Sequence, residues 1–204
     1  MFSVTGIVIL AAGASTRLGE PKQQLLFQGK TLLQRALQTA LDSGCAPVAV
    51  VLGANAEKLI PELAGKPVTV VQNPNWQEGM GSSIRAGLQE LLRLKPELSE
   101  VIFMVCDQPF VEAGVLKRLV QAKQDGRSGI IASAYQGTVG TPVLFDQVYF
   151  PELLALQGQE GAKKIILKHQ PQVTAITFEA GAIDIDTQED YSALLQSDLQ
   201  TRKA

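Results

Sequence analysis

Two glycines and two cations lie close together in residues 11–23, AAGASTRLGEPKQ. Gly13 and Gly19 allow backbone conformations in which several N–H groups converge on one anion, and Arg17 and Lys22 add positive charge beside it. We therefore expect this stretch to hold a triphosphate. Its glycine spacing matches neither the phosphate loop G-x-x-x-x-G-K-[ST] nor the dinucleotide fingerprint G-x-G-x-x-G, which argues against those two cofactor classes. The alternative is a glycine-rich turn with two solvated cations.

A carboxylate, Asp107, follows the apolar run VIFMVC. The run has the composition of a buried strand, and Pro109 cannot extend a sheet, so Asp107 is expected at a strand's carboxyl end. There it could take one coordination position on Mg²⁺, a hard ion that proteins usually share with substrate phosphates. The alternative is an aspartate that caps the next helix. We interpret Cys106 as a buried thiol, with a catalytic thiol as the alternative.

A third polar segment, NPNWQEGMGSSIRAG, occupies residues 73–87. Gly79 and Gly81 would let the backbone pass close to a flat ligand, and an exposed backbone can recognise the hydrogen-bonding edge of a nucleobase. We interpret the segment as a base-recognition loop. Trp76, the single tryptophan of the chain, serves either as a stacking platform or as a packing anchor.

These segments need a scaffold that brings them together. Short β-branched runs alternate with helical patterns along the chain, which predicts βαβ units and a three-layer, Rossmann-like α/β fold with a mostly parallel sheet flanked by helices. In such folds ligands bind beyond the carboxyl ends of the strands, near a switch in strand order, which is where the three segments fall. The predicted strands cover residues 6–10, 47–53, 68–72, 100–106, 129–134, 141–145 and 173–178, and the predicted helices cover 31–44, 82–94 and 111–126.

Length and charge limit the classes of function. The 204 residues suffice for one sizeable core, and no linker divides them, so we expect a single domain over residues 1–204. The 18 basic and 20 acidic residues give a net charge of −2, which argues against binding to nucleic acid or to a membrane surface. No apolar run has the length of a membrane span, and the 2 cysteines favour neither a disulfide framework nor a zinc site. We therefore expect a cytoplasmic protein.

The order of the motifs resembles a known family. LAAGASTRLGEPKQ, NPNWQEGMGSSIRAG, CDQP, GTPVLF and DIDTQEDY are similar to motifs of the nucleotidyltransferases that mature the molybdenum cofactor, above all the cytidylyltransferase branch. The resemblance covers about residues 8–191 and implies a nucleotidyltransferase-type fold. The Ala-Ala-Gly of the first motif implies CTP rather than GTP. The implied nucleotide contacts are Leu10, Ala11, Ala12, Gly13, Lys22, Asn73, Gly79, Gly81, Ser82 and Ser83.

The reaction that the resemblance implies depends on Mg²⁺, with Mn²⁺ as an alternative ion. The terminal phosphate of molybdenum-bound molybdopterin attacks the α-phosphate of CTP, and pyrophosphate leaves. Arg17 and Lys22 would balance charge on the leaving group. Asp107 would hold the metal, together with Asp184 or Asp186. Transfers of this kind need positioning and charge neutralisation rather than a nucleophilic side chain, which weighs against a catalytic thiol.

The acceptor side of the site rests on fewer residues. Residues 137–145, GTVGTPVLF, correspond to a stretch that borders the acceptor pocket in the family, and Lys163 and Lys164 either reach the pterin phosphate or form a solvated face. Three other functions stay open: transfer from GTP, transfer to a sugar or polyol phosphate, and a non-catalytic carrier or chaperone of the molybdenum cofactor. A carrier needs no metal-binding carboxylate beside a triphosphate loop, so Asp107 separates it from the enzymes. A molybdoenzyme or its chaperone is the expected recipient of the product.

Overall fold

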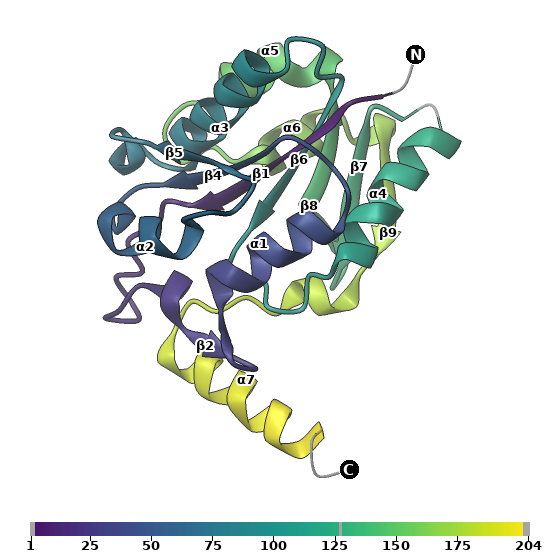
Figure 1. Cartoon of the computed structure of the whole chain (residues 1–204). Helices are drawn as coiled ribbons and strands as arrows, with labels where there is room; N and C mark the ends of the chain where they lie inside the picture. The colour runs from purple at the N-terminus through teal and green to yellow at the C-terminus, as the bar shows by residue number, and fades with distance from the viewer. Residues whose placement is uncertain (1–2, 127, 202–204) are drawn as a thin grey trace.

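Helices lie on both faces of one central sheet (Figure 1). The computed structural model describes residues 3–126 and 128–201. The strands of the sheet are β1 (Thr5–Ala11), β4 (Val48–Leu52), β5 (Thr69–Gln72), β6 (Glu100–Val105), β7 (Ile130–Tyr135), β8 (Thr138–Asp146) and β9 (Val173–Thr177). The helices are α1 (Leu32–Asp42), α2 (Ala56–Leu63), α3 (Met80–Leu94), α4 (Ala113–Asp125), α5 (Phe150–Leu154), α6 (Ala162–Lys168) and α7 (Gln188–Thr201). Helices α1, α2 and α4 cover one face and α3, α5 and α6 the other, which confirms the predicted three-layer α/β fold.

The central strand β1 is buried on both sides. Ile7 and Ile9 pack toward α1, α2 and α4, whereas Val8 and Leu10 pack toward α3, α5 and α6. This alternation follows from the two-residue period of a strand. A continuous apolar run such as β1 is typical of a strand with both faces covered by helices.

The order of the strands creates one switch point. The order is β5-β4-β1-β6-β8-β7-β9, so the chain moves outward from β1 through β4 to β5 and then returns to the other side of β1 with β6. Strands β5, β4, β1 and β6 are parallel, and β8 runs antiparallel between β6 and β7. Leu10 pairs with Val105 near the carboxyl ends of β1 and β6. The loop after β1 and Asp107 therefore meet where ligands bind in open α/β sheets.

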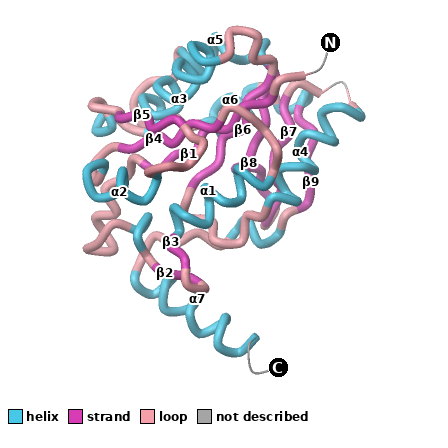
Figure 2. Tube along the Cα trace, viewed as in Figure 1, coloured by secondary structure: helices cyan, strands magenta, loops and turns pink. Residues whose placement is uncertain are grey.

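A small unit projects beyond this edge of the sheet. It consists of α7 and a hairpin of β2 (Leu26–Phe27) and β3 (Lys30–Thr31), and Figure 2 places them side by side. The unit has its own apolar cluster, which joins the loop after β1 to the segment before α7; its buried members are Leu18, Leu25, Phe27, Leu32, Ile185 and Leu194. Of the helices in residues 3–126 and 128–201, none is long and apolar enough to cross a bilayer.

Gly87 lets α3 pack directly on the sheet. A Cβ at this position would clash with Val8 and lie 2.9 Å from a methyl carbon of Val51. We expect Gly87→Ala to lower the free energy of unfolding by about 1–3 kcal/mol, because a packed core accommodates an added methyl group poorly. The matched control is Gly114→Ala in α4, where a Cβ meets no atom within 4 Å. That variant should gain about 0.5–1 kcal/mol, since alanine favours a helix over glycine. Urea denaturation of both variants checks the difference, and equal effects would contradict the packing described.

Candidate active site

The side chain of Gln23 holds the loop after β1. Its Nε2 donates hydrogen bonds to the carbonyl oxygens of Ala11 at 2.9 Å and Gly13 at 3.0 Å, and the residue is 1% exposed. The loop returns to the sheet at Lys22, whose N–H donates to Ser15 Oγ at 3.0 Å. A Cβ on Gly13 would meet no atom within 4 Å, so the loop borders open space there. The loop thus offers free backbone at Gly13 and directs Lys22 toward the strand ends.

Lys22 lies between two carboxylates. Its ammonium forms ion pairs with Asp107 Oδ2 and with Asp186 Oδ1, the latter at 2.9 Å. The side chains of Lys22 and Asp107 are each 16% exposed, so water screens their attraction only weakly. Burial lowers the pKa of Lys22, but the two carboxylates raise it by more, and the net pKa lies above its ordinary value. Lys22 is therefore a fixed positive charge at the carboxyl ends of β1 and β6.

Ile185 brings the two flanking aspartates to Asp107. It is fully buried in the apolar cluster beneath α7, and its N–H donates to the carbonyl oxygen of Asp107 at 3.0 Å. Burial and then the negative charges of Asp107 and Asp186 raise the pKa of Asp184. The hydrogen bond from Lys22 is the main cause that lowers the pKa of Asp186. The charges of Asp107 and Asp186 thus act on Asp184, whereas Asp186 responds mainly to Lys22.

The composition of this cluster fits a divalent metal ion. It contains three carboxylates, and Arg17, which contacts Asp186 Oδ2 at 2.9 Å, is the second cation beside Lys22. Asp107 Oδ1 is buried without a hydrogen-bond partner among the residues that the structure describes. Carboxylate oxygens are the ligands that Mg²⁺ and Mn²⁺ prefer, and phosphates commonly complete their coordination. Within residues 3–126 and 128–201, no three His, Cys, Asp or Glu side chains are grouped so as to hold a metal ion. Asp107, Asp184 and Asp186 therefore do not form a three-carboxylate site as they stand, and phosphates would have to complete the coordination of an ion held by two of them.

The loop of residues 73–87, the predicted base-recognition loop, is shaped by its own polar side chains. Asn73 is 4% exposed, and its Nδ2 donates to the hydroxyl oxygens of Ser82 at 2.8 Å and Ser83 at 3.0 Å. Ser82 donates in turn to the carbonyl oxygen of Gly79 at 2.8 Å. These contacts fix the entry into α3. Nucleotide contacts from the same residues stay a prediction.

The glycines of this loop are explained by contact with another loop. A Cβ on Gly79 would clash with the carbonyl group of Gly158, and one on Gly81 would lie 3.1 Å from the same loop's backbone. The N–H of Gly81 donates to the carbonyl oxygen of Gly158 at 3.1 Å. Close approach to a flat ligand is therefore not needed to explain them. Trp76 is half-buried and packs so tightly on Gly53 that a Cβ there would overlap it, which favours a packing anchor.

Cys106 and the lysines of α6 form no ion pair with the charge cluster of Lys22, Asp107 and Asp186 among the described residues. Cys106 is 3% exposed, and burial followed by the charge of Asp107 raises the pKa of its thiol to about 12. A thiol with this pKa stays protonated at neutral pH, which favours the buried-thiol interpretation. Lys163 and Lys164 are both exposed, and Lys164 pairs with Glu160 on the surface. This placement favours a solvated face.

Two buried glutamines near the site were not predicted to be functional. Gln23 holds the loop after β1, as described above. Gln108 is 7% exposed, and its Nε2 donates to the carbonyl oxygen of Gly181 at 2.7 Å. Gln23 directly follows Lys22, and Gln108 directly follows Asp107, and both of these neighbours are predicted catalytic residues. This adjacency is the signal in the sequence that could have identified the two glutamines.

The chain is similar to several curated proteins along nearly its whole length. The nicotine blue oxidoreductase of Paenarthrobacter nicotinovorans is 32% identical, and the match covers 94% of this chain and 96% of that protein. The purine catabolism protein PucB of Bacillus subtilis is 28% identical, with coverage of 90% and 92%. The molybdenum cofactor cytidylyltransferase of Escherichia coli is 22% identical, with coverage of 93% and 94%.

Solved structures share the fold and a related sequence. Rv0371c from Mycobacterium tuberculosis H37Rv matches with a TM-score of 0.80 at 31% identity, over 96% of this chain and 99% of that one. The same protein in complex with manganese matches with a TM-score of 0.77 at 29% identity, over 96% and 100%. A sequence model of the MobA-like NTP transferase domain matches residues 7–173, most of the chain. The chain therefore belongs to the MobA-like NTP transferase domain family.

Proposed function

We propose that this nucleotidyltransferase transfers CMP from CTP to the terminal phosphate of molybdenum-bound molybdopterin and releases pyrophosphate. The observation that carries the proposal is the Lys22 ammonium, which lies between Asp107 and Asp186 at the switch in strand order. Membership of the family supports nucleotidyl transfer in general. The choice of CTP and molybdopterin is supported by the resemblance of the motifs and by the similarity to the Escherichia coli cytidylyltransferase.

The reaction balances without a covalent enzyme intermediate. An oxygen of the acceptor phosphate attacks the α-phosphorus of CTP, the bond from that phosphorus to the bridging oxygen breaks, and pyrophosphate carries away the electron pair. Lys22 and Arg17 neutralise the charge that grows on this leaving group. Asp107, with Asp184 or Asp186, would hold a Mg²⁺ or Mn²⁺ ion, which when bound supplies further charge neutralisation and alignment of the phosphates. The manganese complex of the structural relative supports a divalent ion.

The nucleotide is proposed to lie along the open side of the loop after β1. The backbone from Leu10 to Gly13 runs off the strand end there, beside the open space at Gly13. The carbonyl oxygen of Ala12 accepts a hydrogen bond from the N–H of Ala54 at 3.2 Å, and Gly53 packs against both Ala12 and the base-recognition loop. The two loops are therefore contiguous, which supports one site for phosphates and base.

Thermal unfolding with added nucleotides tests the proposal. CTP with Mg²⁺ at about 100 times its Kd is expected to raise the Tm by about 5–10 °C. Binding at that concentration stabilises the native state by about 2.7 kcal/mol, and each kcal/mol corresponds to about 2–4 °C in a chain of this size. GTP, ATP and UTP at the same concentration should give smaller shifts. A larger shift with GTP would contradict the choice of CTP and favour the guanylyl alternative.

The proposal also specifies the acceptor phosphate and the recipient of the product. Sugar and polyol phosphates are the alternative acceptors, and a molybdoenzyme or its chaperone is the proposed recipient. A non-catalytic carrier is disfavoured, because it has no use for the charge cluster of Lys22, Asp107 and Asp186. Release of pyrophosphate with molybdopterin, but with neither sugar nor polyol phosphates, supports the proposed acceptor.

A second candidate function for this chain is an oxidoreductase activity. It rests on the 32% identity to the nicotine blue oxidoreductase. The glycine spacing after β1 differs from the dinucleotide fingerprint, which counts against a nicotinamide cofactor at that loop. Oxidation of NADH or NADPH in the presence of nicotine blue is the measurement that favours this candidate, and its absence together with pyrophosphate release favours the transferase.

A further inference from the structure

The carboxylates of the site come from two segments that are far apart in the sequence. Asp107 follows β6, whereas Asp184 and Asp186 follow β9 and the 3-10 helix η5 (Glu179–Ala182). Their relative placement depends on contacts between these segments. One is the N–H of Ile185 on the carbonyl oxygen of Asp107, at 3.0 Å. The second is made by the side chain of Gln108.

Gln108 uses both ends of its amide group. Its Nε2 donates to the carbonyl oxygen of Gly181 in η5 at 2.7 Å, and its Oε1 accepts from Thr141 Oγ1 of β8 at 3.2 Å. The hydroxyl of Tyr135, at the end of β7, lies close to Gln108 and Thr141. An amide that turned over would place its oxygen against the carbonyl oxygen of Gly181. The carbonyl oxygen of Gly181, which can only accept, therefore selects the orientation in which the amide holds η5.

The ring of Tyr135 fits a slot between two glycines. A Cβ on Gly140 would clash with the Tyr135 hydroxyl, and a Cβ on Gly181 would lie 2.6 Å from the Tyr135 ring. The residue that Gln108 holds, Gly181, is thus also the residue that packs on Tyr135. These contacts form a partly buried connection from β7 and β8 through Gln108 to the segment that carries Asp184.

We propose that Gln108 is a positioning residue, which sets the distance between Asp107 and the Asp184–Asp186 pair by holding Gly181, with Tyr135 packed against the same glycine. This inference rests on the proposed function for its catalytic consequence, because the carboxylates matter there as metal ligands. Gln108 itself is proposed to touch neither the nucleotide nor the metal. It acts on the carboxylates through the backbone between Gly181 and Asp184.

Hydrogen exchange and Mn²⁺ binding test this proposal on Gln108→Met and Tyr135→Phe. In Gln108→Met the amide of Ile185 should exchange about tenfold faster, the effect of losing one buried hydrogen bond in a local opening. The amide of Asp146, which donates to Gly129 at 2.8 Å at the other end of the sheet, should keep its rate. The Kd for Mn²⁺ alone, measured by electron paramagnetic resonance, should rise about tenfold. Tyr135→Phe should show smaller changes in the same direction.

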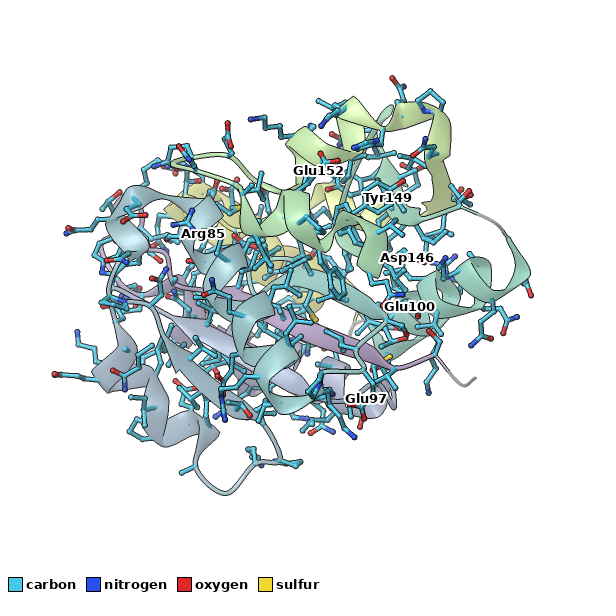
Figure 3. All side chains as sticks on the ribbon, turned by 90° about the horizontal axis from the view of Figure 1, so that it is seen from above. Arg85, Glu97, Glu100, Asp146, Tyr149 and Glu152 are labelled. Atoms are coloured by element: carbon cyan, nitrogen blue, oxygen red, sulfur yellow. The ribbon has the colours of Figure 1, made fainter. Side chains whose placement is uncertain are left out.

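The matched control is Tyr149→Phe, which removes a tyrosine hydroxyl that is bonded to a glutamine far from the charge cluster, Gln172, at 2.6 Å. Figure 3 shows Tyr149 close to Glu152 and Asp146, on the side of the molecule formed by α5. This variant should change neither the Ile185 amide nor Mn²⁺ binding. Unchanged exchange of Ile185 in both test variants would overturn the proposal. If the wild-type chain releases no pyrophosphate from any nucleotide but Ile185 responds as expected, the positioning role stands and the proposed function fails.

Discussion

An Asp107→Asn variant is expected to release pyrophosphate about 10³-fold more slowly than the wild-type chain while it keeps its fold. The substitution preserves the shape of the side chain but removes the charge that pairs with Lys22. It also replaces one of the two carboxylate oxygens of Asp107 by an amide nitrogen. One of these oxygens, Oδ1, is buried and has no hydrogen-bond partner among the described residues. A metal-bound or ion-paired carboxylate at a centre of charge development supplies several kcal/mol, which corresponds to a loss of this size.

The control for this variant is Asp146→Asn. Asp146 forms an equivalent ion pair with Lys123, at 2.8 Å, and pairs in register with Glu100 at the amino end of β6, opposite to the end that carries Asp107. Its loss should affect stability but leave the rate of pyrophosphate release within about twofold. Steady-state kinetics with CTP, Mg²⁺ and molybdopterin provide the comparison. Equal rates for Asp107→Asn and the wild type would rule out Asp107 as a metal ligand.

Replacement of Lys22 by methionine is expected to lower kcat by about 10²- to 10³-fold. Methionine keeps the length and the apolar stem of lysine, so the variant loses the charge rather than the packing. The ammonium then no longer balances the leaving pyrophosphate, and Asp107 and Asp186 are left to repel each other. Because the contact with pyrophosphate strengthens as the bond breaks, the loss should fall on kcat more than on KM for CTP.

Lys123→Met separates catalysis from stability. The side chain of Lys123 is 15% exposed, nearly the same as the 16% of Lys22, and each lysine pairs with a partly buried aspartate. Both substitutions should lower the free energy of unfolding by about 1–3 kcal/mol, since each leaves a partly buried carboxylate without its partner. Lys22→Met alone should lose activity. Similar kcat values for the two variants would mean that Lys22 is structural.

The strands of the sheet could be predicted because buried strands consist largely of apolar residues. A run such as residues 6–10 is apolar throughout, and all of the predicted strands and helices are present in the structure. Helix α2 was missed because Pro61 interrupts its helical pattern. The β2–β3 hairpin was missed because its strands have two residues each, and its turn uses Gln28 and Gly29, both with positive φ, in place of the more familiar Asn-Gly.

The charge cluster of the site could be predicted only in part. Lys22 and Asp107 lie in loops that follow neighbouring strands, so strand order predicts that these two loops lie close together. Asp184 and Asp186 follow no strand directly and were placed by resemblance to the family, and the structure connects them to Asp107 through the backbone of Ile185. That connection depends on tertiary packing beneath α7, which no local pattern encodes.

The glycines of the predicted base-recognition loop lie against another loop of the chain rather than in open space. Gly79 and Gly81 were noticed because glycine allows close approach, and the structure confirms close approach but to the loop that holds Gly158. A glycine pattern therefore predicts that some group comes near the backbone, without saying which group. The same holds for glutamines 23 and 108, whose side chains satisfy backbone carbonyl groups that the sequence leaves unspecified.

The most direct test of the central claim is to detect the product. The wild-type chain is incubated with Mg²⁺, molybdenum-bound molybdopterin and CTP, GTP, ATP or UTP, and both pyrophosphate and the dinucleotide form of the cofactor are measured, the latter by mass spectrometry. We predict one pyrophosphate for each cytosine dinucleotide formed, and the highest rate with CTP. Dinucleotide formation that prefers GTP, or no dinucleotide with any of the four nucleotides, would contradict this prediction.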